Sequence, residues 1–99
     1  MIEIEYRTSK LKKVCTDAEY ATKQYGSEMA EKIHQRIDEI ASAVSVEMLV
    51  QFRIGRCHPL TGNRKGQYAM DLTHPYRLVF EKIDNQVIAV EILEIVDYH

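Results

Sequence analysis

The main change in the spacing of apolar residues along this chain occurs near Gly55, between a mostly helical part and a part made of strands. Before Gly55, the apolar residues of segment 28–43 recur every three or four positions, which is the period of an amphipathic helix. After it, the apolar residues of segment 76–81 recur at every second position, which is the period of a strand. The order of these patterns predicts an α+β fold, with N-terminal helices packed on a mostly antiparallel sheet.

The same two periods predict the remaining elements. Alternation over residues 2–7 predicts a first strand, and helical spacing predicts a helix that starts near Leu11 and ends at Gly26. Ser27 is a candidate N-cap for the helix over 28–43, and Ser45 restarts a short helical segment. The other strands complete a four-stranded sheet and are expected over 67–72, 76–81 and 87–96.

Two local signals refine the expected sheet. Asp84-Asn85 separates two strand patterns and is typical of a hairpin turn. Glu94 interrupts the almost continuous apolar run of 87–96, which leaves open a β-bulge at that point.

Length and composition indicate one domain over residues 1–99. No apolar run approaches the roughly 20 residues of a membrane span, and the acidic N-terminus does not resemble an export signal, so we expect a cytoplasmic protein. Cys15 and Cys57 match no metal-ligand spacing and are expected to be reduced thiols. Cys57 precedes His58, but nothing else in the sequence indicates a cysteine-based mechanism. No metal and no cofactor are expected.

The most distinctive polar segment is 58–68, which combines an imidazole, a guanidinium and an ammonium group with turn-forming glycines. The surrounding run, 48–70, contains no Asp or Glu, although the formal net charge of the chain is -2. Its basic residues are Arg53, Arg56, His58, Arg64 and Lys65. A cationic zone in an acidic chain predicts a phosphate-bearing partner.

The motif His-Pro-Leu-x-Gly-x-Arg-x-Gly at 58–66, followed by Tyr-Arg-Leu-Val-Phe at 76–80, resembles the HigB branch of the RelE/ParE toxin superfamily. The final Asp-Tyr-His at 97–99 resembles the ending of that branch. The resemblance implies a RelE/ParE-like fold and a bacterial type II toxin. It also implies a cognate helix-turn-helix antitoxin of the HigA type, through which alone the toxin would reach operator DNA. HigB-like toxins generally act as ribosome-dependent endoribonucleases on messenger RNA.

Metal-independent RNA cleavage needs a base for the ribose 2′-OH and an acid for the leaving 5′-oxygen. His58 and His99 are the natural proton carriers, because histidine titrates near neutral pH. Asp97 is a candidate to orient a histidine or to act as base, and Tyr98 to stack on a base or donate to the phosphate. His99 is terminal, so the strand before it must anchor it.

The reaction also needs cations for the charge that builds on the phosphate. Arg77 and Arg64 are candidates for this role through their forked donors, and Arg56 and Lys65 are expected to hold RNA backbone. Tyr76 supplies an aromatic plane beside them. The alternative for Arg77 is an ion pair with an acid of a neighbouring strand, such as Glu91 or Glu94.

One position departs from the family pattern. Thr61 stands where HigB relatives commonly have a lysine, and a hydroxyl cannot replace a cation; Lys65 or Arg64 on the same loop are candidates to compensate. Two other functions therefore remain open. One is a ParE-like toxin that binds a topoisomerase, because a fold does not fix a function. The other is a non-catalytic interaction module, a decayed toxin.

Overall fold

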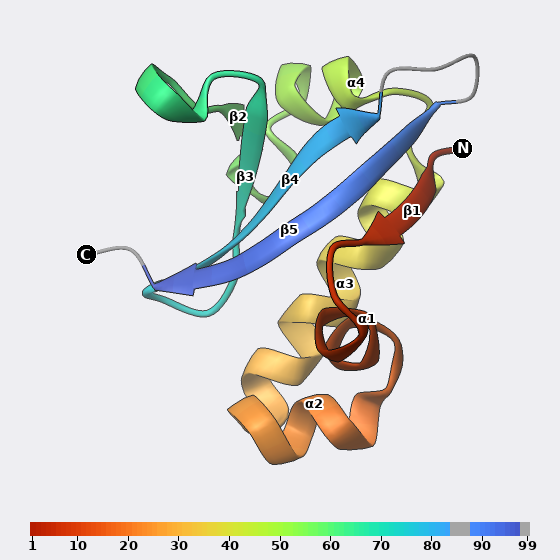
Figure 1. Ribbon diagram of the computed structural model, residues 1–99, viewed down its shortest axis with the longest axis vertical. Coiled ribbons are helices and arrows are strands. Elements are labelled where there is room, and N and C mark those ends of the chain that lie inside the picture. Colours follow the sequence, from red (N-terminus) through yellow and green to blue (C-terminus); the bar gives the residue numbers. More distant parts are fainter. Residues whose placement is uncertain (84–87, 98–99) are drawn as a thin grey trace.

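The computed structural model describes residues 1–83 and 88–97 (Figure 1). Its helices are α1 (Ser9–Thr16), α2 (Ala18–Tyr25), α3 (Ser27–Ser42) and α4 (Val46–Gln51), with short 3-10 turns η1 (Ile54–Arg56) and η2 (Gly62–Arg64). Its strands are β1 (Glu3–Tyr6), β2 (His58–Pro59), β3 (Gln67–Asp71), β4 (Tyr76–Ile83) and β5 (Ala89–Asp97). Within the described ranges, no helix has both the length and the apolar character that a bilayer span requires.

The sheet has five strands in the order β1-β5-β4-β3-β2, one more than predicted. β1 pairs with β5 in parallel, and the other neighbours are antiparallel. The additional strand is β2, in which His58 pairs with Ala69 and Pro59 with Tyr68. Two residues are too short to show a period, and a proline without an N–H suits the edge position that β2 occupies. This edge strand joins His58 to the sheet.

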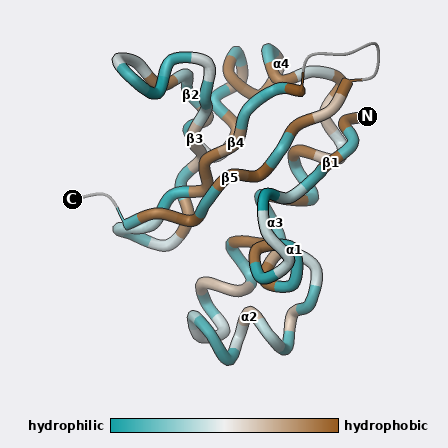
Figure 2. The backbone as a smooth tube through the Cα atoms, in the orientation of Figure 1, coloured by the Kyte–Doolittle hydropathy of each residue, from teal (hydrophilic) through white to brown (hydrophobic). Residues whose placement is uncertain are grey.

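The helices pack on one face of the sheet, as predicted. The main core joins the helices to β3, β4 and β5, and Phe80, Ile33, Ile40 and Leu49 within it are fully buried. The opposite face, which we call the open face, carries a small apolar cluster of Ala69, Val79 and Leu93, against which Leu60 and Val96 pack. Figure 2 shows hydrophobic residues along β4 and β5 and hydrophilic ones in the loop after β2. The open face is therefore the part of the sheet that remains accessible to a ligand.

The predicted N-terminal helix is interrupted at Asp17, which ends α1 and begins α2. Its backbone is extended, with φ -120° and ψ 105°, and its Oδ1 accepts hydrogen bonds from the N–H groups of Glu19 and Tyr20. Aspartate favours such caps over helix interiors, so the helix restarts here. Gly26 ends α2 with a positive φ of 88°, as predicted, and it also occupies the N-cap position of α3 that was expected of Ser27.

The register of β4 against β5 shifts once, between Val79 and Phe80. Val79 pairs with Glu94, whereas Phe80 pairs with Ile92, so Leu93 is the additional residue of a bulge. The bulge lies beside Glu94, where the sequence pattern is interrupted. The expected hairpin turn at Asp84-Asn85 lies outside the described residues.

A buried arginine ties α3 to the sheet and to η1. Arg36 is 9% exposed; its Nε donates to the backbone carbonyl of Asp71 at 2.6 Å, and its Nη1 donates to Glu39 at 2.8 Å. Gly55 of η1 lies directly against the guanidinium, because a Cβ at Gly55 would be 2.6 Å from Arg36 Nε. The end of β3 and the turn η1 are thus held by one side chain.

This packing predicts different effects for alanine at two glycines with similar backbone angles. Gly55 and Gly62 have φ of 58° and 67°, but nothing lies within 4 Å of a Cβ at Gly62. Gly62→Ala should lower the free energy of unfolding by about 1–2 kcal/mol, the cost of a left-handed side chain. Gly55→Ala should cost about 3 kcal/mol or more, because it also displaces Arg36 from Asp71. Equal losses in urea denaturation would contradict this role of Gly55.

Candidate functional site

The charges of the open face separate along its strands. At one end, Asp71 pairs with Arg77 across β3 and β4, and Arg77 in turn lies opposite Val96 of β5. Residues directly opposite in a sheet point to the same face, so this row lies on the open face. The next row runs from His58 through the apolar Ala69 and Val79 to Glu94. The far end is acidic, and its row consists of Gln67, Glu81, Glu91 and Glu5.

Asp71 brings two guanidinium groups together. Its Oδ2 lies 3.2 Å from Arg56 Nε, and its Oδ1 lies 3.5 Å from Arg77 Nε. The side chains of Asp71 and Arg77 are each 31% exposed, whereas that of Arg56 is 71% exposed. The carboxylate therefore holds an exposed and a partly enclosed cation close to one point, which is an arrangement that also suits a phosphate.

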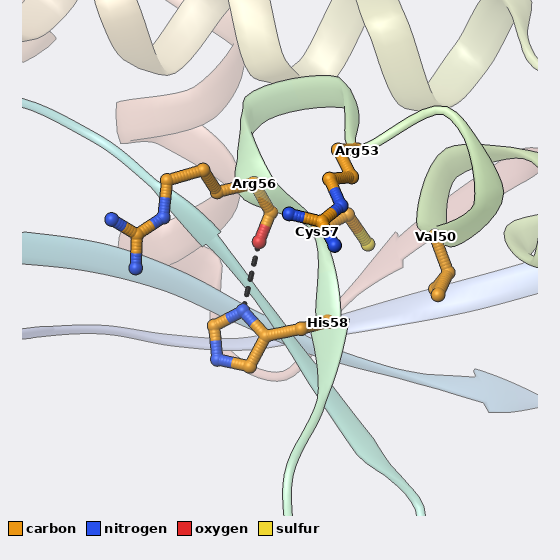
Figure 3. A pocket seen from close by; sticks show the side chains of 5 residues that line it. All are labelled: Val50, Arg53, Arg56, Cys57 and His58. Carbon is orange, nitrogen blue, oxygen red and sulfur yellow. Dashed lines mark hydrogen bonds between the residues drawn. The ribbon is translucent and has the colours of Figure 1, made fainter.

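His58 is positioned beside these cations in a defined chemical form. Its Nδ1 lies 2.8 Å from the backbone carbonyl oxygen of Arg56 (Figure 3). A carbonyl oxygen only accepts hydrogen bonds, so Nδ1 carries the proton. The neutral ring then has a lone pair on Nε2, which can accept a proton from a bound molecule. The imidazole is half-buried at the edge of the sheet.

A pocket with a volume of about 540 Å³ opens beside His58. The described residues that line it are Val50, Arg53, Arg56, Cys57 and His58, drawn in Figure 3. Burial raises the pKa of the Cys57 thiol to about 12, so the thiol is neutral near neutral pH and is a poor nucleophile. The pocket's polar chemistry therefore comes from its arginines and its imidazole.

Arg64 and Lys65, two of the predicted cations, differ in their surroundings, because Arg64 is hydrogen-bonded to other side chains and Lys65 is exposed. The guanidinium of Arg64 donates to Glu94 at 2.6 Å and to Gln67 at 2.9 Å, so it fixes the loop after β2 on the open face. Its charge is largely balanced by Glu94. Lys65 is exposed on the same loop. Of these two candidates for replacing the cation missing at Thr61, Lys65 is the one that remains exposed to a ligand.

Tyr76 and the chain end do not all share the open face. Tyr76 packs against the helices, with its ring 5.9 Å from that of Tyr25 in an edge-to-face contact. Asp97 pairs with Tyr76, so β5 ends at the same end of the sheet as Arg77. The sequence places Tyr98 and His99 directly after Asp97, but both lie outside the described residues. The structure thus groups His58, Arg56 and Arg77. It places Tyr76, and Asp97 opposite it in the register, on the other face.

Two residues of this arrangement were missed in the sequence. Among the described residues, Arg77 forms its ion pair with Asp71 rather than with Glu91 or Glu94. In a hairpin centred on His74, positions 71 and 77 lie opposite each other. The pairing of Asp71 with Arg77 could therefore have been predicted from the position of the turn. Arg36 was missed because its partner is a backbone carbonyl, which no side-chain pattern reveals.

Within residues 1–83 and 88–97, no group of three His, Cys, Asp or Glu side chains is arranged to hold a metal ion.

The solved structures that resemble this chain in fold include toxins. A YoeB/ParE toxin from Agrobacterium tumefaciens matches with a TM-score of 0.63 and 18% identity, over 99% of this chain and 100% of that chain. A chain of the YoeB-YefM complex from Staphylococcus aureus matches with a TM-score of 0.63 and 24% identity, over 100% and 98%. A chain of the YoeB dimer from Staphylococcus aureus matches with a TM-score of 0.63 and 24% identity, over 99% of this chain and 97% of that chain. Neither a scan of protein families nor a search of curated proteins gives a match.

At these identities the likeness establishes the fold. The predicted α+β, RelE/ParE-like class is confirmed, with five strands in place of four. The neighbours described here are YoeB and YoeB/ParE proteins, and none of them is a HigB protein.

The hydrogen bond of His58 predicts the tautomer of its neutral ring. At a pH where the imidazole is uncharged, ¹⁵N-edited NMR spectra should show the proton of His58 on Nδ1, because Nδ1 donates to the Arg56 carbonyl. The exposed His74, on the turn between β3 and β4, is the internal reference. A His58 proton mainly on Nε2 would contradict the arrangement.

Proposed function

We propose that this protein is the toxin of a type II toxin–antitoxin system and that it cleaves messenger RNA on the ribosome without a metal ion. The observation that carries the proposal is the open-face cluster, in which His58 has Nε2 available and Asp71 gathers Arg56 and Arg77. The cluster provides a proton acceptor beside paired guanidinium groups, which are the groups that phosphodiester cleavage requires.

In the proposed reaction, the ribose 2′-oxygen attacks the adjacent phosphorus while His58 Nε2 takes the 2′-OH proton. The bond from phosphorus to the 5′-oxygen breaks, and that oxygen takes a proton from an acid. The products are a 2′,3′-cyclic phosphate and a 5′-hydroxyl end. Asp97, Tyr98 and His99 are the proposed source or supports of that acid. Asp97 lies opposite Tyr76 in the register, on the other face from Arg77, so in this proposal it acts from the end of β5.

The negative charge on the phosphate is stabilised by Arg56 and Arg77 in this proposal. The ion pair of Asp71 with the 71%-exposed Arg56 is worth at most about 1 kcal/mol, because water screens it. Hydrogen bonds of guanidinium groups to phosphate are charge-assisted and contribute about 1.5–3 kcal/mol each. Arg56 can therefore turn from Asp71 to a phosphate at little cost.

The remaining candidate RNA contacts are Lys65, Arg64 and Tyr76. Lys65 is exposed on the loop beside the open face and suits RNA backbone. Arg64 is held by Glu94, and Tyr76 lies on the helix side, so both would act from the edges of the site. With a net charge of -2, the chain has little long-range attraction for free RNA, which favours mRNA presented by the ribosome.

The proposed partners are a cognate antitoxin and, through it alone, operator DNA. The structures from Staphylococcus aureus include YoeB bound to the antitoxin YefM, which supports an antitoxin as partner for a toxin of this fold. The more specific expectations are a HigA-like helix-turn-helix antitoxin, a place in the HigB branch and a cytoplasmic location. They rest on the sequence motif at 58–66 and on composition.

The proposal is tested by expressing the toxin without its antitoxin. Translation should stop, and transcripts should carry cuts that map to the ribosomal decoding site. His58→Ala should lower the cleavage rate on programmed ribosomes by about 10²–10⁴-fold, the contribution typical of a general base. His74→Ala is the matched control, because His74 is exposed on the β3–β4 turn, and it should cleave at the wild-type rate.

Other outcomes would select the alternatives. Growth arrest with intact transcripts and DNA damage would indicate a ParE-like toxin that binds a topoisomerase. Growth arrest that persists when either the His58→Ala or the Arg77→Ala variant is expressed would contradict catalysis by the open face. Absence of any toxicity would indicate a decayed, non-catalytic toxin.

A further inference from the structure

The pocket beside His58 contains a cation that the proposed cleavage does not use. Arg53 precedes η1 and is exposed, and within the described part of the chain it has no ion-pair partner. Arg53 and Arg56 both adopt left-handed backbone angles, with φ of 52° and 56°. Non-glycine residues rarely adopt this region, and such strain persists only where the surrounding structure holds it. Arg36, packed under Gly55, supplies that support.

The pocket is cationic, whereas the other end of the open face is acidic. None of the described residues that line it is acidic, and Arg53, Arg56 and His58 are its polar members. The acidic row that includes Glu81 and Glu91 lies toward the other end of the open face. An RNA strand whose scissile phosphate lies at His58 is therefore attracted toward the pocket and repelled from the acidic row.

We infer that the pocket is a second phosphate subsite, which binds the phosphate next to the scissile one, with Arg53 as its principal cation. The inference rests on the proposed function. Arg56 and His58 form the border that the two subsites share, and the side chains of Val50 and Cys57 offer an apolar surface for the ribose. The volume of about 540 Å³ lies within the roughly 300–1,000 Å³ of small-ligand pockets. The ligand class is single-stranded RNA with two consecutive phosphodiesters.

The test compares ligands that differ by one phosphate. The probes are an uncleavable 2′-deoxy dinucleotide with one phosphodiester and the corresponding trinucleotide with two, each titrated into the full chain by NMR. Arg53→Asn removes the cation but retains a residue that tolerates left-handed angles. Arg7→Asn is the charge-matched control, because Arg7 follows β1, on the opposite edge of the sheet from β2.

The wild-type protein should bind the trinucleotide more tightly than the dinucleotide. Arg53→Asn should abolish that difference, leave dinucleotide binding unchanged and reduce the salt dependence of trinucleotide binding by about 0.7 in the log–log slope. Arg7→Asn should retain the difference. If Arg53→Asn also binds the trinucleotide more tightly than the dinucleotide, or binds both ligands more weakly by the same factor, the subsite is refuted while the proposed function stands. If the wild-type protein binds neither ligand and transcripts stay intact on ribosomes, the proposed function fails as well.

Discussion

The hydrogen bond from Arg36 to the backbone carbonyl of Asp71 is the interaction on which the candidate site depends. A buried guanidinium is costly unless its donors are satisfied, and here they reach Asp71 at 2.6 Å and Glu39 at 2.8 Å. Gly55 packs against the same group, so α3, the end of β3 and η1 form one unit. Because that unit carries the Asp71 carboxylate and the Arg56 side chain, a buried contact on the helix side determines the geometry of the open face.

Charge separation lets a slightly acidic chain present a local cationic zone, which is the proposed phosphate site. Asp71 pairs with both Arg56 and Arg77, and Glu94 pairs with Arg64 in the next row. The cations that remain in excess lie near η1, whereas the row through Glu81 is acidic. Such a surface selects for ligands that approach one end of the sheet, and its weak overall attraction suits a substrate delivered by a larger assembly.

The change of apolar period near Gly55 was enough to predict the α+β class, because patterning decides which faces are buried. It could not reveal β2, whose two residues have no period, nor the helix break at Asp17, which depends on a local side-chain cap. His58 and Arg77, which the motif singled out, lie in neighbouring rows of the open face. Strand parity would have placed Tyr76 on the other face, because successive residues of a strand point in opposite directions. Arg36 could not be predicted, because its role appears only when the backbone of β3 is in place.

The most direct test of the account is a cryo-electron microscopy structure of the protein on a ribosome whose mRNA carries a 2′-deoxy nucleotide at the cleavage position. The account predicts that the scissile phosphate lies over the open face, within hydrogen-bonding distance of Arg77 and Arg56, with His58 Nε2 directed at the modified ribose. RNA bound on the helix side, or a protein that leaves the decoding-site mRNA untouched, would contradict it.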